Sequence, residues 1–247
     1  MQTIDLIHFA NPDELAHAAA SAWLDELAHA KRAAKSYCVA LSGGRITQKF
    51  FTAIVEQARA RKIGDGGTPS LPSNVHFFWA DERCVPPTDP ESNFKMAQEL
   101  LFAPLNISAA NIHRLRGEDT PESAVNLAEI ELRQIAAPDK NGLPVLDLIL
   151  LGMGEDGHVA SLFPNATPEI LNCPTPFLVV KNSPKPPPLR LSLSHAAIAA
   201  AAKVWVLASG AGKESAFRES LSPSGQSPLA KVLQSRSATK VFSDLPA

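Results

Sequence analysis

Short apolar runs alternate with longer helix-like segments along most of the chain, and this alternation constrains the fold more than any other feature. The apolar runs cover residues 4–9, 37–41, 75–79, 146–151, 177–180, 204–208 and 240–242. Runs that are apolar at nearly every position are typical of strands buried on both faces, as in a parallel sheet covered by helices. We therefore expect an α/β fold with a mostly parallel sheet flanked by helices.

Helical patterns fill most of the gaps between the apolar runs. The first begins at Asn11-Pro12, where a capping side chain precedes a proline in the first turn, and continues to about residue 34. The others cover residues 47–61, 93–101, 121–136, 195–202 and 213–221, and loops rich in Gly or Pro lie at 63–73, 138–144, 164–176, 184–188 and 222–228. None of these loops is long enough to be a domain linker, so we expect one domain over residues 1–247.

Composition narrows the class of protein. The chain carries 23 basic and 25 acidic residues, a net charge of -2, which argues against a nucleic-acid binder and requires any anion site to be a local cluster of cations. No apolar run approaches the ~20 residues that span a bilayer, and no basic and apolar leader opens the chain. We expect a cytoplasmic protein without membrane or nucleic-acid partners, as a monomer or weak homo-oligomer.

Cys38, Cys84 and Cys173 form no C-x-x-C pair, which predicts free thiols rather than a zinc site or a disulfide.

Ligands bind outside the carboxyl ends of the strands in open α/β sheets, so the residues that follow each apolar run are candidates for a site. Ser42-Gly43-Gly44 follows the run at 37–41 and precedes a helix. Glycine amides and a helix N-terminus together suit an anion such as phosphate, although a tight turn without a ligand has the same sequence. The charged triplet Asp81-Glu82-Arg83 follows the run at 75–79 and also fits a solvated strand end.

Two later strand ends offer cations. The stretch from Ser209 to Lys213 resembles a Walker loop but lacks its first glycine, because position 207 is Leu, so we expect a simpler phosphate contact from Lys213. The run at 177–180 leads into a proline-rich segment that ends at Arg190. This segment predicts either a surface polyproline connector or a rigid arm that brings Arg190 to an anion, which the guanidinium would grip with two parallel bonds.

Gly152-x-Gly154-x-x-Gly157 spells the dinucleotide-binding fingerprint, but the residues downstream argue against a nucleotide cofactor. Four prolines fall within 20 residues of Gly157, at positions 164, 168, 174 and 176, and leave no room for the crossover helix that this motif requires. The next apolar run ends in Lys181-Asn182, without an acid to bind a ribose.

The same stretch holds Asp156 and His158, two residues apart. In an extended loop, such side chains leave on one side, so the carboxylate would orient the imidazole and raise its basicity. Histidine is the natural general base at neutral pH, although a hydrogen-bonded loop histidine without a catalytic role has the same pattern. The chain contains no G-x-S-x-G nucleophile elbow and no H-E-x-x-H zinc motif.

Five blocks together resemble the 6-phosphogluconolactonase family, over roughly positions 10 to 240. They are Ser42-Gly43-Gly44, then Asp81-Glu82-Arg83-x-Val85-Pro86 with Ser92-Asn93, then Leu151-Gly152-Met153-Gly154-x-Asp156-Gly157-His158-x-Ala160-Ser161-Leu162-Phe163-Pro164, then the proline-rich stretch into Arg190, and finally Gly212-Lys213. The block that ends at Pro164 is the most specific of the five.

The resemblance implies a Rossmann-like α/β fold related to glucosamine-6-phosphate deaminase and ribose-5-phosphate isomerase. It implies hydrolysis of 6-phospho-D-glucono-1,5-lactone to 6-phosphogluconate in the oxidative pentose phosphate pathway, without a cofactor or metal. On this hypothesis the catalytic residues are His158, Asp156 and Arg83, of which Arg83 or a glycine N–H stabilises the developing oxyanion. The substrate-binding residues are Ser42, Gly43, Gly44, Asp81, Arg190 and Lys213.

The sequence also departs from its relatives at informative positions. The family commonly continues its glycine turn with Thr-Pro, whereas Thr47 is followed here by Gln48, which should affect helix entry more than chemistry. Related deaminases carry a glutamate shortly after the histidine and a tyrosine after the Asp-Glu pair, but residues 161–164 hold no acid and Arg83 stands after Glu82. Both features favour the lactonase over an amino-sugar phosphate deaminase. The other open alternative is a non-catalytic sugar-phosphate sensor, against which the intact Asp156 and His158 weigh.

Overall fold

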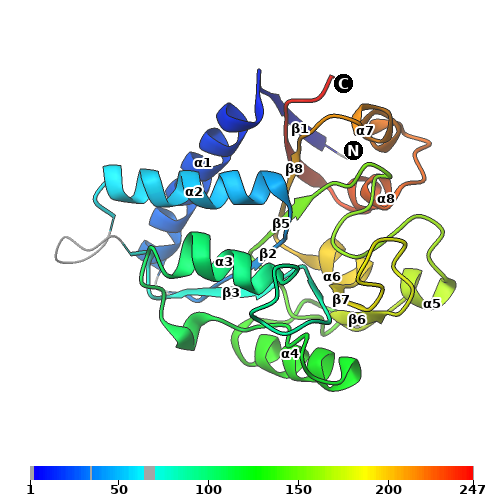
Figure 1. The fold of residues 1–247 in the computed structure, drawn as a ribbon, viewed down its shortest axis with the longest axis horizontal. Coiled ribbons are helices and arrows are strands. Elements are labelled where there is room, and N and C mark those ends of the chain that lie inside the picture. The colour runs from blue at the N-terminus through cyan, green and yellow to red at the C-terminus, as the bar shows by residue number, and fades with distance from the viewer. Residues whose placement is uncertain (1–2, 34, 64–69, 247) are drawn as a thin grey trace.

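The computed structural model describes residues 3–33, 35–63 and 70–246, and its centre is a sheet of six parallel strands. The strand order is β1-β9-β8-β5-β2-β3 (Figure 1). The bounds are Thr3–His8 for β1, Tyr37–Leu41 for β2, Val75–Trp79 for β3, Leu148–Gly152 for β5, Lys203–Ala208 for β8 and Ala238–Ser243 for β9. The predicted α/β fold with a mostly parallel sheet is confirmed.

A second, antiparallel sheet was not predicted. It contains β4 (Asp81–Arg83), β7 (Arg190–Leu193) and β6 (Phe177–Val180), in the order β4-β7-β6. Only β6 has an apolar run long enough to be recognised in the sequence, because β4 is three charged residues and β7 directly follows the proline-rich segment. The register pairs Arg83 with Arg190 and so brings two predicted site residues together.

Eight helices connect the strands within the described residues. Their bounds are Pro12–Ala33 for α1, Arg45–Ala60 for α2, Asn93–Ala97 for α3, Pro121–Ile135 for α4, Pro168–Leu171 for α5, His195–Ala200 for α6, Glu214–Leu221 for α7 and Pro228–Ser235 for α8. The helix predicted at 93–101 divides into α3 and a π-helical turn at Gln98–Phe102, and α5 and α8 were not predicted. The short α5 agrees with the expectation that no crossover helix follows Gly157. The predicted helix end at 34 and most of the predicted loop at 63–73 lie outside the described residues.

The core lies between the parallel sheet and its covering helices. On α1, the buried Leu15, Ala19 and Trp23 recur at helical spacing and form one apolar face, and α1 crosses and packs against α2 (Figure 1). Every residue of β2 and all but the last residue of β5 are buried, as the continuous apolar runs predict. β1 differs, because it is an edge strand on which Ile4 and Leu6 are exposed.

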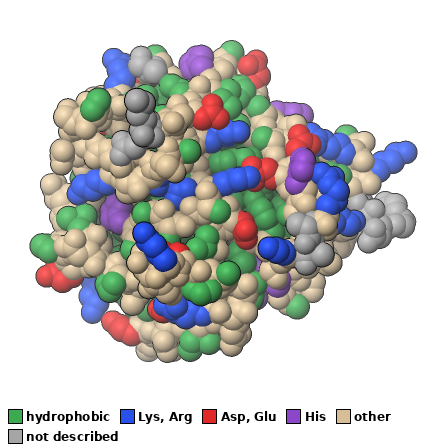
Figure 2. Space-filling model, turned by 180° about the vertical axis from the view of Figure 1, so that it is seen from behind, with side chains coloured by type: hydrophobic (Ala, Val, Ile, Leu, Met, Phe, Trp, Pro, Cys, Tyr) green, Lys and Arg blue, Asp and Glu red, His purple; other side chains and the backbone are tan. Residues whose placement is uncertain are grey.

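The outer surface carries mixed charge. Figure 2 shows Lys and Arg side chains dispersed over one face among Asp and Glu side chains, rather than gathered into one patch of a single sign. In the part of the chain that the structure describes, no helix is both long and apolar enough to cross a membrane.

Candidate active site

The candidate site lies at the carboxyl ends of β2 and β5, where the direction of strand connection reverses. From β2 the chain continues to β3 on one side, and from β5 it continues to β8 on the other. Open α/β sheets bind ligands at such a switch point. A pocket of about 290 Å³ opens here, and its lining includes eight of the nine predicted site residues: Ser42, Gly43, Gly44, Asp81, Arg83, His158, Arg190 and Lys213. The ninth, Asp156, is hydrogen-bonded to His158.

The segment after β5 is a tight turn and not the extended loop that we expected. The N–H of Gly154 donates to the carbonyl oxygen of His158 at 2.9 Å, and the N–H of Gly157 donates to that of Gly154 at 3.1 Å. Gly157 has a φ of 76°, which favours glycine. At Gly154, a Cβ atom would overlap with Nδ1 and Cε1 of the His158 ring. The glycines therefore provide the bend and the space that the histidine ring occupies.

Asp156 holds His158 through two hydrogen bonds. Its Oδ1 accepts from the ring Nδ1 at 2.5 Å and from the backbone N–H at 3.2 Å. The ring also packs against Phe163, with 4.7 Å between the ring centroids. Because Nδ1 must be the donor to a carboxylate, this network assigns the proton of the neutral ring to Nδ1 and leaves Nε2 as the acceptor.

The environment keeps this pair in the charge state that a general base requires. Burial lowers the pKa of His158 below its ordinary value of 6.5, and this effect outweighs the hydrogen bond to Asp156, which acts to raise it. For Asp156, burial acts to raise the pKa, but the hydrogen bonds donated by His158 outweigh this effect and lower the pKa. At neutral pH the histidine is therefore unprotonated and the aspartate is ionised.

The turn after β2 forms the start of α2. Gly44 is the N-cap of this helix with a φ of 104°, and no side chain caps the helix. The first-turn N–H groups are thus available at the pocket, where the helix terminus carries roughly half a positive charge. At Gly43 a Cβ atom would overlap with the side chain of Asn93. Ser42 differs from the expectation, because its hydroxyl donates to the carbonyl oxygen of Leu150 at 2.7 Å and has no hydrogen left for a phosphate.

The two acids after β3 have different surroundings. Asp81 lines the pocket, and its Oδ2 accepts a hydrogen bond from the hydroxyl of Ser161 at 2.7 Å. Glu82 is buried and does not line the pocket. Its carboxylate accepts four hydrogen bonds, from the backbone N–H groups of Arg83, Asn93 and Phe94 and from the hydroxyl of Ser92. Glu82 therefore anchors the start of α3.

The paired arginines of β4 and β7 face different partners. Arg83 donates through Nη1 to the backbone carbonyl of Glu91 at 2.6 Å and to its carboxylate at 3.2 Å, and its buried Nε has no hydrogen-bond partner within the described ranges. Arg190 is only 4% exposed and donates to three successive carbonyls of the proline-rich loop. These bonds occupy Nε and Nη2. We expected two nitrogens of Arg190 to bind an anion, but that contact would break some of these bonds. Nη1 alone remains for a ligand.

Lys213 lies at the start of α7 with its side chain partly buried. No acceptor or acid bonded to its ammonium group is found among residues 3–33, 35–63 and 70–246. Burial lowers the pKa of Lys213, and the nearby charge of Arg45 lowers it further, while Glu155 acts in the opposite direction. An unpaired ammonium group at a pocket is suited to an anionic ligand.

Two further cations at the pocket, Arg45 and Lys185, were not predicted as site residues. Arg45 is the first residue of α2, and its position directly after the glycine turn is a signal that the sequence offers. Lys185 lies in the proline-rich loop beside other cations, and nothing in its spacing distinguishes it from them. With Arg83, Arg190 and Lys213, the pocket thus has five cations. They form the local cluster that an anion site requires in a chain whose net charge is -2.

Metal-ligating side chains do not gather in the described part of the chain. No group of three or more His, Cys, Asp or Glu side chains is placed there to hold a metal ion. Cys38, Cys84 and Cys173 are free thiols, as the sequence predicts.

Comparisons with known proteins add a family and a fold. A family model described as glucosamine-6-phosphate isomerases/6-phosphogluconolactonase matches residues 10–242. A 6-phosphogluconolactonase from Streptomyces coelicolor is 34% identical over 230 residues, which cover 91% of this chain and 85% of the relative. The solved 6-phosphogluconolactonase of Trypanosoma brucei has a TM-score of 0.82 at 24% identity and covers 98% and 96% of the two chains. A monomeric glucosamine-6-phosphate deaminase of the NagB superfamily has a TM-score of 0.76 at 18% identity and covers 96% and 95%. These two structures show that the fold is shared by lactonases and deaminases.

Proposed function

This chain belongs to the family of glucosamine-6-phosphate isomerases and 6-phosphogluconolactonases, and we propose that it hydrolyses 6-phospho-D-glucono-1,5-lactone to 6-phospho-D-gluconate in the oxidative pentose phosphate pathway. One observation carries the proposal: a neutral histidine held by a carboxylate lies in the same pocket as a cluster of cations. The first is suited to activating water, and the second to holding a sugar phosphate. The name of the Streptomyces coelicolor relative supports the same activity.

His158 is the proposed general base. Its Nε2 takes a proton from water while the water oxygen attacks the lactone carbonyl carbon. The tetrahedral intermediate then collapses, the bond from this carbon to the ring oxygen breaks, and the protonated His158 returns the proton to the departing oxygen. Asp156 keeps the ring in position and fixes its proton on Nδ1. Such general-base catalysis contributes roughly 10²–10⁴-fold to a rate.

Arg83 is the proposed donor to the oxyanion. The catalytic turn is the segment after β5 that holds Asp156 and His158. Its glycine N–H groups are poor candidates, because those of Gly154 and Gly157 already donate within the turn. Arg83 lines the pocket, and its bonds to Glu91 use only Nη1, so that Nη2 has no hydrogen-bond partner in the described structure. A donor that is already in place where charge develops stabilises the transition state without reorganisation.

The phosphate would lie at the cationic part of the pocket. We propose that the backbone of Gly43 and Gly44, Nη1 of Arg190 and the ammonium group of Lys213 hold it, and that Asp81 accepts hydrogen bonds from the sugar hydroxyls. Ser42 supports this arrangement by linking the ends of β2 and β5 through its bond to Leu150. Its hydroxyl is not a proposed phosphate donor.

An amino-sugar phosphate deaminase is the alternative that the shared fold leaves open. Deaminases of the family carry a glutamate shortly after the catalytic histidine for ring opening, whereas residues 159–164 hold no acid. Ser161, within this stretch, donates to Asp81 and does not act as an acid. This difference favours the lactonase.

The activity test uses freshly generated 6-phosphogluconolactone and follows acid release above the spontaneous rate. We expect the protein to accelerate hydrolysis and His158→Ala to lower turnover by roughly 10²–10⁴-fold while 6-phosphogluconate still binds. His17→Ala is a control, because His17 is an exposed residue of α1 far along the chain from the pocket. Ammonia release from glucosamine 6-phosphate would identify a deaminase. Tight binding of 6-phosphogluconate without any turnover would identify a sensor.

We also propose that the enzyme acts in the cytoplasm, which is supported by three free thiols in the described chain. Reducing conditions would keep them in that state. Fractionation of cells that express the tagged protein tests this location.

A further inference from the structure

The proline-rich loop before β7 is folded into a closed structure by hydrogen bonds at its base. The backbone N–H of Ser183 donates to the carbonyl oxygen of Pro188 at 2.9 Å. The hydroxyl of Ser183 donates to the carbonyl oxygen of Lys185 at 2.8 Å and accepts from the N–H of Lys185 at 3.2 Å. The backbone on both sides of the Lys185 side chain is therefore fixed by one small residue.

Arg190 fixes the same loop from the other side. Its Nε donates to the carbonyl oxygen of Pro187 at 2.7 Å, and its Nη2 donates to those of Pro186 at 2.8 Å and Lys185 at 3.2 Å. A planar guanidinium presents its donors in a rigid fork, so three carbonyls bound to it cannot move independently. Because Arg190 is itself buried and part of β7, the loop is tied to the antiparallel sheet.

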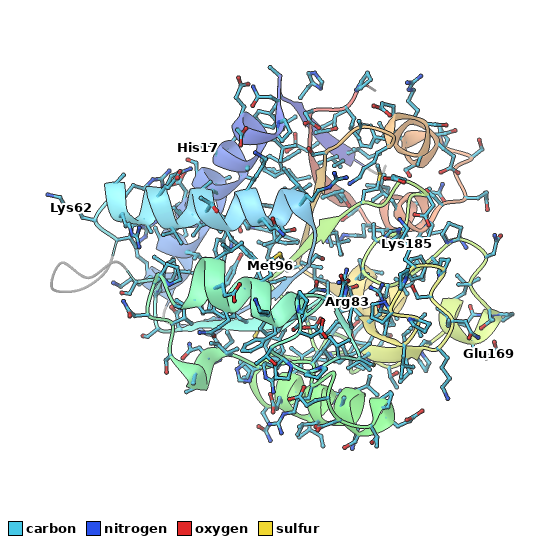
Figure 3. The ribbon with its side chains drawn as sticks, in the orientation of Figure 1. His17, Lys62, Arg83, Met96, Glu169 and Lys185 are labelled. Atoms are coloured by element: carbon cyan, nitrogen blue, oxygen red, sulfur yellow. The ribbon has the colours of Figure 1, made fainter. Side chains whose placement is uncertain are left out.

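The result is that Lys185 lines the catalytic pocket although its loop is exposed. Figure 3 shows Lys185 and Arg83 to the right of the centre of the view, where both line the pocket, while Lys62 and Glu169 lie at opposite edges. No hydrogen bond or ion pair engages the Lys185 ammonium group within residues 3–33, 35–63 and 70–246. A cation that is placed at a pocket and left unpaired is available to an anionic ligand.

We propose that Lys185 is a substrate-binding residue that selects for the phosphate group, and that Arg190 is the positioning residue that sets its place. This inference rests on the proposed function, because it assumes that the anion in the pocket is a sugar phosphate. It assigns most of the donor capacity of Arg190 to the loop carbonyls, and only Nη1 to the ligand. The phosphate would then be shared among Lys185, Lys213, Nη1 of Arg190 and the N-terminus of α2.

The positive charge of Lys185 affects pKa values in both functional parts of the pocket, the part proposed to bind phosphate and the part proposed to activate water. It lowers the pKa of Lys213, where burial is the largest cause, and it lowers the pKa of His158, where burial is again the largest cause and Asp156 and Asp81 oppose it. Removal of this charge should therefore weaken phosphate binding and also raise the pKa of His158. A residue with a merely structural role would not produce both effects.

The test compares Lys185→Met with Lys181→Met. Lys181 is a matched control, because it belongs to the same segment but is exposed, pairs with Glu122 at 3.4 Å and does not line the pocket. For Lys185→Met we expect KM for 6-phosphogluconolactone and the inhibition constant of inorganic phosphate to rise by roughly tenfold or more, with kcat within about twofold. Hydrolysis of unphosphorylated glucono-1,5-lactone should not change at pH values above the acid limb, where His158 is unprotonated in both proteins, and Lys185→Arg should restore most of the loss. The acid limb of the kcat/KM profile should move to higher pH.

Arg190→Lys tests the positioning role, because it keeps a positive charge but cannot bridge three carbonyls. We expect weaker phosphate inhibition, and we expect the double variant with Lys185→Met to be no weaker than Arg190→Lys alone. If Arg190→Lys does not fold, Ser183→Ala loosens the same loop without changing a pocket cation and should give the same result. If the two substitutions instead weaken phosphate inhibition independently, so that their effects multiply in the double variant, the positioning role of Arg190 is wrong.

The outcomes separate this inference from the proposed function. If the unaltered protein fails to hydrolyse the lactone, the proposed function is wrong, and phosphate binding by isothermal titration still tests Lys185. If the unaltered protein is active and Lys185→Met has an unchanged KM and unchanged phosphate inhibition, the proposed function stands and the assignment of Lys185 is wrong.

Discussion

Gly154→Ala is the substitution that most directly tests how the catalytic turn works. A Cβ atom at this position would overlap with Nδ1 and Cε1 of His158 and would lie 2.8 Å from Oδ1 of Asp156. The new methyl group therefore enters the space of the hydrogen bond that joins the two side chains. Because the overlap is with side chains and not with backbone, the ring can move away while the fold is kept.

The expected size of the effect follows from what the displaced ring loses. A histidine that is no longer held by Asp156 cannot accept a proton in the correct position, so turnover should fall by roughly 10²–10⁴-fold, as for loss of a general base. Overpacking of this kind costs about 1–3 kcal/mol of unfolding free energy, and in a chain of this size each kcal/mol lowers Tm by about 2–4 °C. Activity should thus be lost far more than stability.

The assay measures initial rates of acid release beside thermal unfolding of the same preparation. Gly152→Ala is the matched control, because a Cβ atom there would have its nearest neighbour, the carbonyl oxygen of Gly43, at an ordinary 3.7 Å. We expect the titration of His158, followed by NMR, to be unchanged in the control and altered in Gly154→Ala. Turnover of Gly154→Ala within about threefold of the unaltered protein would refute the role that we assign to this glycine.

Three further predictions concern protonation and anchoring. The acid limb of the kcat/KM profile should lie below pH 6.5, because burial lowers the pKa of His158 and a base is lost only as the pH falls through that lowered value; a limb at or above 6.5 would contradict this. Asp156→Asn removes the charge that acts to raise the pKa of His158, so the acid limb should move still lower and kcat should fall by about 10²-fold or more; an unchanged profile would count against the pairing. Glu82→Gln turns an acceptor into a donor that faces other donors, and should lower the unfolding free energy by about 2–4 kcal/mol in chemical denaturation with little change in KM. An unaltered denaturation midpoint would show that Glu82 does not anchor α3.

That the candidate site residues gather at one edge of the sheet could be predicted, because this depends on strand ends alone. Ser42, Asp81 and Lys213 each follow an apolar run or a short turn after one, and the carboxyl ends of parallel strands meet at one edge of the sheet. The prolines after Gly157 correctly excluded a crossover helix, and only the four-residue α5 forms there. The start of α8 could also have been found, since Ser227-Pro228 is a capping residue followed by proline.

The directions in which side chains point could not be predicted in the same way. Asp81 and Glu82 are adjacent, and the sequence does not say which faces the pocket and which anchors a helix. The pairing of Arg83 with Arg190 depends on two strands of three and four residues, too short to show a period of two. Lys185 reaches the pocket because Arg190 donates to the backbone carbonyls of residues 185–187, and backbone carbonyls are the same in every residue.

The proposed base and the proposed phosphate-selecting lysine belong to different sheets: the turn with His158 follows β5 of the parallel sheet, and the loop with Lys185 precedes β7 of the antiparallel one. For laboratory evolution, this division separates chemistry from substrate choice. A library confined to the loop at 183–188 would sample new anion preferences while the hydrolytic turn keeps its inherited geometry. Variants selected from this library for lactones with other acidic substituents should therefore retain turnover and differ mainly in which lactones they bind.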